Sequence, residues 1–180
     1  MRLPSSMKKL ALLSGILLAA ATALVAIALQ GGDREAAGFL GPGTLIADFN
    51  LLLEILLLLG VTFGYWLART GSIEAHRVNQ TCWVLVNAAL VAASMFESMG
   101  NVKLAKVGDL GNPYLAITWL HAAIGTGTVA AGLWLVLQMN DVLPQAWHVQ
   151  RWKTLMRATL AGYWIVALLG IATYRAWYAS

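Results

Sequence analysis

Residues 45–68 read LIADFNLLLEILLLLGVTFGYWLA, a run that is apolar over most of its length and contains no lysine or arginine. A helix of about 20 such residues crosses a hydrocarbon core about 30 Å thick. The run therefore predicts a membrane-spanning helix. It also places Asn50 and Glu54 within that helix, where an ionisable group is costly and usually faces the interior of a helix bundle.

The rest of the chain has the same character. Of its 180 residues, 59% are hydrophobic and only 11% are charged, a combination that excludes an ordinary soluble domain. We predict an all-α membrane protein with five transmembrane helices in an antiparallel bundle. The predicted spans are residues 10–30, 45–68, 80–99, 114–138 and 158–175. Residues 1–43 are then an N-terminal anchor helix with an outer loop, and residues 44–180 are a four-helix membrane bundle.

The first predicted span also resembles a secretory signal. It has a basic start, an apolar centre and small residues near its end. Its apolar run is longer than the core of a typical signal peptide, so we expect a retained anchor helix. A cleaved signal is the alternative.

The basic residues predict the orientation, because they gather on the cytoplasmic side of membrane proteins. In the five-span arrangement, eight lie on the side of the N-terminus: Arg2, Lys8, Lys9, Arg69, Arg77, Arg151, Lys153 and Arg157. Four lie on the opposite side: Arg34, Lys103, Lys106 and Arg175. This predicts a cytoplasmic N-terminus. The net positive charge is explained by this topology and by anionic lipid head groups, so no nucleic-acid partner is expected.

Polar residues within the predicted spans form a candidate metal site. Asn50 and Glu54 are four residues apart and share a helix face. Glu97 and His121 lie in the same outer half of the membrane on the next two spans. Two carboxylates and an imidazole from facing helices suit iron, manganese or zinc. The alternatives are hydrogen bonds that hold helices together without a metal, and a proton path or quinone-type polar pocket.

Copper and haem are further cofactor candidates. Met95 and Met99 are four residues apart and, with His121, offer soft ligands for copper. His121, His76 and His148 are the candidate haem ligands, but only His121 lies well inside a predicted span. A bis-histidine haem that involves His121 is therefore disfavoured. His76 and His148 are expected at the cytoplasmic surface, where they either meet each other or are solvated.

No sequence motif indicates an enzyme. The chain has no GxSxG, HExxH, Walker loop or GxGxxG motif, and Cys82 is its only cysteine. A single cysteine allows neither an internal disulfide nor a CxxC metal site, and thiol chemistry is not expected. A non-catalytic role is favoured.

Four features, in order along the chain, match a known pattern: Asn50, the run GSIEAHRVNQ at 71–80, His121, and the run RATLAGYWIVALLGIATY at 157–174. With these features, spans two to five resemble a bacterial family of four-helix membrane proteins catalogued as domain of unknown function 420. Some members of that family are associated with assembly or maturation of haem-copper cytochrome oxidase. The resemblance implies a helical bundle and a partner in a membrane redox complex.

The chain departs from the family pattern at two positions. Glu97 stands where a histidine is expected near the end of span three, and Trp152 stands where one is expected before span five. In this resemblance His148, four residues before Trp152, would be a shifted equivalent of the second. A glutamate in place of the first histidine preserves the capacity to bind a metal, and Glu54 would complete a set of metal ligands with it. A tryptophan in place of the second does not preserve that capacity. If the histidines of the family bind a metal or haem, the resemblance implies that part of that site is altered or lost in this chain.

These observations predict an integral-membrane assembly or accessory subunit of a respiratory or other membrane redox complex. It would lie in the bacterial cytoplasmic (inner) membrane and pack against larger subunits and the lipid bilayer. The alternative is a small redox protein involved in electron transport, with a metal ion (iron or copper) or haem in the outer half of the bundle. A proton or small-solute carrier ranks last, because the inner halves of the spans contain few polar groups.

Overall fold

The computed structural model describes residues 5–32, 36–95 and 111–178. This part of the chain is helical and contains no β-strand. The elements are α1 (Ser5–Gly31), α2 (Leu45–Arg69), α3 (Ile73–Leu90), the π-helical turn η1 (Val91–Met95), α5 (Pro113–Met139), the 3-10 turn η3 (Gln145–Trp147) and α6 (Trp152–Tyr178).

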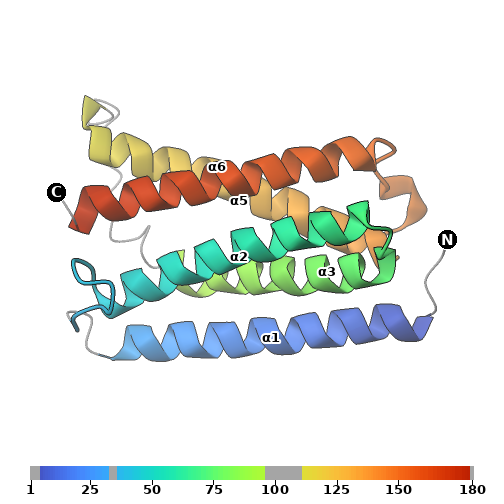
Figure 1. Ribbon diagram of the computed structural model, residues 1–180, viewed down its shortest axis with the longest axis horizontal. Helices are drawn as coiled ribbons and strands as arrows, with labels where there is room; N and C mark the ends of the chain where they lie inside the picture. Colours follow the sequence, from blue (N-terminus) through green and yellow to red (C-terminus); the bar gives the residue numbers. More distant parts are fainter. Residues whose placement is uncertain (1–4, 33–35, 96–110, 179–180) are drawn as a thin grey trace.

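Successive helices run in opposite directions along one common axis (Figure 1). Helix α1 lies on one side of the bundle and packs mainly on α3, whereas α5 and α6 pair on the other side. Helices α2 and α3 lie between these two groups. The start of α1 and the end of α6 are therefore at opposite ends of the bundle (Figure 1).

Among the described residues, four helices are long and apolar enough to cross a membrane: α1, α2, α5 and α6. Each of them contains one of the predicted spans 10–30, 45–68, 114–138 and 158–175, although α1 begins five residues and α6 six residues before the predicted start. Helix α3 is not one of the four, and the predicted third span, 80–99, ends outside the described residues. Helix α3 also begins well before residue 80, so most of the run GSIEAHRVNQ is helical and not part of a loop.

The helix ends follow local rules. Thr44 caps α2 by accepting a hydrogen bond from the backbone N–H of Ala47 at 3.4 Å, and Asn112 caps α5 through Tyr114 N–H at 3.0 Å. Pro113 follows Asn112 at the first helical position, where its missing N–H costs nothing. Gly71, with φ of +85°, makes the tight turn between α2 and α3.

The apolar core lies where α2, α3, α5 and α6 meet. Its buried members are Leu57, Val61, Val84, Val136 and Tyr163. The outer faces are apolar as well: on α1, Leu17 is 70% exposed and Leu24 is 68% exposed. Large apolar side chains that point outward along a whole helix suit contact with lipid and not with water.

Two polar contacts fix α1 on the bundle. Near its end, Gln30 Nε2 donates to the carbonyl of Ala93 in η1 at 2.6 Å. Near its start, Lys8 forms an ion pair with Asp141 in the connection between α5 and α6. Helix α1 is therefore tied at both ends to the four helices that follow it.

Candidate functional site

Glu54 and His121, two of the predicted metal ligands, lie together between α2, α5 and α6. Glu54 Oε1 lies 4.0 Å from His121 Nδ1, and both side chains are largely buried. His121 Nδ1 donates a hydrogen bond to the carbonyl of Val166 on α6 at 3.2 Å. Gly170, one turn further along α6, lies so close that a Cβ there would overlap the Glu54 carboxylate. The missing side chain of Gly170 is what makes room for Glu54.

Three oxygen atoms of this region are buried without a hydrogen-bond partner in the described part of the chain: Asn50 Oδ1, Glu54 Oε1 and Thr173 Oγ1. Buried polar atoms are usually satisfied, so these oxygens can accept a hydrogen bond or bind a cation. We call Asn50, Glu54, His121, Gly170 and Thr173 the carboxylate seam. Chemically, the seam can hold a proton, a water molecule or a small cation.

Only part of the predicted metal set falls within the described residues. Glu97 lies outside them, and so does Met99. Within the described residues, no group of three or more His, Cys, Asp or Glu side chains could hold a metal ion. Glu54 and His121 are brought together as predicted, but two such ligands are fewer than the three or four protein ligands of a typical transition-metal site.

His76 is buried, with 6% exposure, which contradicts the prediction of a surface histidine. Its Nδ1 donates to the carbonyl of Gly64 on α2 at 2.7 Å. The early start of α3 explains the difference, because it places His76 one turn inside the helix and against α2.

Asn79 and Gln80 make the same kind of contact as His76. Asn79 Nδ2 donates to Gly60 O at 2.8 Å, and Gln80 Nε2 donates to Val61 O at 2.9 Å. Side chains at Gly60 and Gly64 would overlap α3 residues, so the spacing GxxxG permits the close approach of the two helices. The run at 71–80 therefore binds α3 to α2.

His148 lies after η3, half-buried, and its Nε2 donates to the carbonyl of Leu143 at 3.1 Å. It lines a small cavity with Lys8, Arg77 and Asp141, whereas His76 lines a different, larger one. In the part of the chain that the structure describes, no hydrogen bond joins the two histidines. The alternative in which they meet each other is therefore not seen.

One further contact, between Asp48 and Tyr174, has no signal in the sequence. Asp48 is fully buried at the start of α2 and accepts hydrogen bonds from Tyr174 Oη and from Leu40 N–H, each at 2.5 Å. Asp48 thereby ties the end of α6 and the loop before α2 to the start of α2. A separation of 126 residues hides such a pair from pattern reading.

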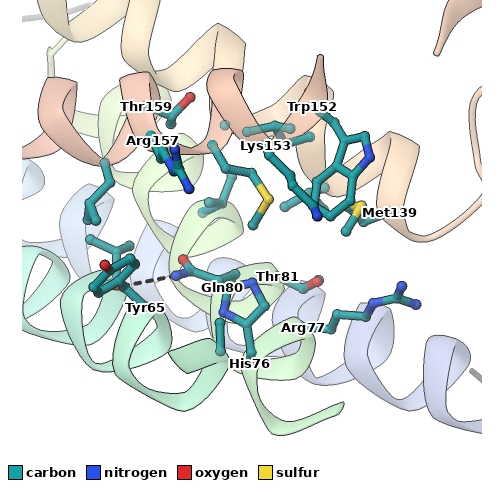
Figure 2. A pocket seen from close by; sticks show the side chains of 18 of the residues that line it. Tyr65, His76, Arg77, Gln80, Thr81, Met139, Trp152, Lys153, Arg157 and Thr159 are labelled. Atoms are coloured by element: carbon teal, nitrogen blue, oxygen red, sulfur yellow. Dashed lines mark hydrogen bonds between the residues drawn. The ribbon is translucent and has the colours of Figure 1, made fainter. Parts of the chain in front are cut away.

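A cavity of about 440 Å³ lies among α2, α3, α5 and α6, at the end where α2 finishes and α6 begins. Figure 2 shows Trp152, Lys153 and Arg157 of α6 on one side of it and Tyr65, His76 and Gln80 on the other. Four basic side chains line it: Arg69, Arg77, Lys153 and Arg157. We call it the basic cavity. From the sequence these residues indicated only orientation, and their gathering around one space was missed.

Comparisons of the chain with protein-family models, with curated proteins and with solved structures find no match.

Proposed function

We propose that this chain is a non-catalytic assembly or accessory protein of a membrane redox complex. In this proposal it crosses the bacterial cytoplasmic membrane five times, with α3 as the third span and the N-terminus in the cytoplasm. The alternating direction of α1, α2, α3, α5 and α6 supports five crossings (Figure 1). The resemblance to the oxidase-assembly family supplies the class of partner.

One observation carries the proposal: the polar side chains of the run at 71–80 are used to hold helices together. His76, Asn79 and Gln80 each donate to a backbone carbonyl of α2. A histidine and two amides engaged in this way build a firm scaffold and leave little polar chemistry for a reaction. In this proposal the protein acts through its outer surface.

Helix α5 offers a surface suited to a partner helix. Its residues Ala123, Gly127 and Ala130 are exposed and recur at intervals of four and three, so they share one helix face. Nothing lies within 4 Å of the position that a Cβ would occupy at Gly127. Small residues on a membrane helix let the backbone of a neighbouring helix approach closely.

The test is affinity purification of the tagged full-length chain from native membranes in mild detergent. Larger haem-containing subunits are expected to co-elute with the wild type. Ala130→Leu should reduce their yield, because it fills the small-residue face of α5. The matched change Ala21→Leu, at an exposed position of α1, should leave the yield unchanged. Elution of the chain without any redox subunit would overturn the proposal.

A second candidate function, a small metal-binding redox protein, is favoured by the carboxylate seam. Glu54 and His121 face each other, and the oxygens of Asn50 and Thr173 are buried nearby on α2 and α6 without partners among the described residues. Metal analysis and an optical spectrum of the isolated chain test this candidate. Stoichiometric iron, copper or haem that is lost in His121→Ala would favour it over the accessory role.

A further inference from the structure

The basic cavity combines an apolar wall with positive charge at its rim. Its wall includes Val61 of α2, Val84 of α3, Leu135 of α5 and Leu160 of α6. Its volume of about 440 Å³ falls in the range of about 300–1,000 Å³ that is usual for small-molecule sites. A ligand that fits this space has an apolar body and a polar end.

The charges specify the polar end. Arg69, Lys153 and Arg157 are exposed basic side chains on the rim, and the described residues that line the cavity include no aspartate or glutamate. The Nε of Arg77 is buried without a hydrogen-bond partner in the described part of the chain. A buried donor without an acceptor is destabilising, and guanidinium groups match phosphate and carboxylate oxygens in geometry. The charge therefore favours an anionic head group.

The position of the cavity specifies where that ligand comes from. It lies at one end of α2, α3, α5 and α6, so its rim is at the level where a span leaves the hydrocarbon core. Lys153 Nζ lies 5.4 Å from the centre of the Trp152 ring, and Tyr65 is 46% exposed beside the opening. Tryptophan, tyrosine and basic residues of this kind gather at the level of lipid head groups. An exposed rim lets a ligand exchange with the surrounding bilayer.

We propose that the basic cavity binds one acidic glycerophospholipid, with its phosphate among Arg69, Lys153 and Arg157 and an acyl chain along the apolar wall. Basic pockets between membrane helices recognise anionic lipids through this combination of charge and apolar contact. The inference does not depend on the proposed accessory function. A haem has similar amphipathic character, and it is the main competing occupant.

The test is native mass spectrometry of the full chain after exchange into mixed micelles that contain equal amounts of phosphatidylglycerol and phosphatidylcholine. The readout is the ratio of the two bound lipids. We expect phosphatidylglycerol to be favoured by the wild type. The triple variant Arg69→Gln, Lys153→Gln, Arg157→Gln should lower the ratio by on the order of a hundredfold, since each basic side chain near an acidic lipid contributes roughly a factor of five.

A charge-matched control is Lys9→Gln, Arg151→Gln, Arg175→Gln, three exposed residues that line neither cavity. It removes three positive charges, as the cavity variant does, but leaves the cavity intact. It should therefore leave the ratio within about twofold of the wild type, and a larger fall would show that non-specific attraction to the net charge sets the ratio. If the first triple variant fails to fold, as judged by circular dichroism, single changes carry the test. Arg157→Gln should then lower the ratio about fivefold, while Arg157→Lys and Arg151→Gln should not.

The proposal is overturned if the cavity variant and the control lower the ratio equally, or if neither lowers it. It is also overturned if the purified wild type carries stoichiometric haem that is lost on changing the cavity residues. Inorganic phosphate is the probe for a free anion. Displacement of phosphatidylglycerol by inorganic phosphate alone would assign the site to phosphate and not to lipid.

Discussion

The carboxylate seam and the basic cavity lie between the same helices, α2, α5 and α6, yet they are built in opposite ways. In the seam, Glu54 and His121 are largely buried, and Gly170 lets α6 close directly onto the carboxylate. In the cavity, Arg69, Lys153 and Arg157 remain exposed around an open space of about 440 Å³. One set of polar groups faces neighbouring helices, and the other faces a cavity.

This difference separates residues that hold the bundle together from residues that are available to a ligand. Burial of a polar side chain is costly, so it persists where the side chain bonds a neighbour or where function requires it. Exposed basic residues around an apolar cavity contribute little to folding, because solvent screens their charges. Mutations should therefore affect stability at the seam and lipid binding at the cavity.

The largest expected effect is that of Gly170→Leu. A Cβ alone at this position would overlap the Glu54 carboxylate, so a leucine there displaces that carboxylate from its buried position or moves α2 and α6 apart. We expect the free energy of unfolding in detergent to fall by about 1–3 kcal/mol, as for other overpacked sites. Gly127→Leu is the control, because nothing lies within 4 Å of the position that its Cβ would occupy. Equal effects of the two changes would show that the seam is not tightly closed.

His76→Ala should have the next largest effect, although His76 lines the basic cavity. It removes the hydrogen bond to Gly64 O and a buried ring. We expect a loss of about 1–2 kcal/mol in the free energy of unfolding, measured by chemical denaturation in detergent. A loss of lipid selectivity without a loss of stability would instead assign His76 to ligand binding.

A double-mutant cycle on Glu54→Gln and His121→Ala measures how strongly the two seam residues depend on each other. The two side chains are 4.0 Å apart and are not hydrogen-bonded to each other, so their coupling should be below about 1 kcal/mol. The measurement is thermal unfolding of the wild type, both single variants and the double variant. A coupling of about 3 kcal/mol that disappears on addition of a chelator would indicate a shared metal ion.

Arg157→Gln should have the smallest effect on stability. Its side chain is exposed and has no ion-pair partner among the described residues, so the free energy of unfolding in neutral detergent should change by less than about 0.5 kcal/mol. Added phosphatidylglycerol should raise the unfolding temperature of the wild type more than that of the variant. An equal rise in the unfolding temperature of the wild type and the variant would show that Arg157 does not contribute to lipid binding at the cavity.

The long apolar helices were well predicted from the sequence, because hydropathy depends on local composition. The third helix was predicted to begin only at residue 80, because a search for uninterrupted apolar residues excludes the charged Arg77 and Glu74 before it. A helix needs backbone hydrogen bonds and not apolar residues, so α3 continues through both positions to Ile73. That single displacement also explains why His76 was expected at the surface.

The candidate site could be predicted in part. Depth along each span brought Glu54 and His121 to the same level, and they do face each other. The role of Gly170 was not predictable, because it depends on how α6 packs against α2. The gathering of Arg69, Lys153 and Arg157 was hidden for the same reason: their charge indicates a membrane side, but only tertiary packing decides which of them share a cavity.

The buried polar groups of this chain, in the role that we propose for it, hold helices together, while any redox cofactor belongs to its partners. The most direct test is the reduced-minus-oxidised optical spectrum of the tagged complex, recorded before and after the 180-residue chain is separated from its partners. We expect the haem bands to remain with the larger subunits and to be the same for the wild type and His121→Ala. Bands that stay with the isolated chain and vanish in His121→Ala would show instead that the chain itself holds the cofactor.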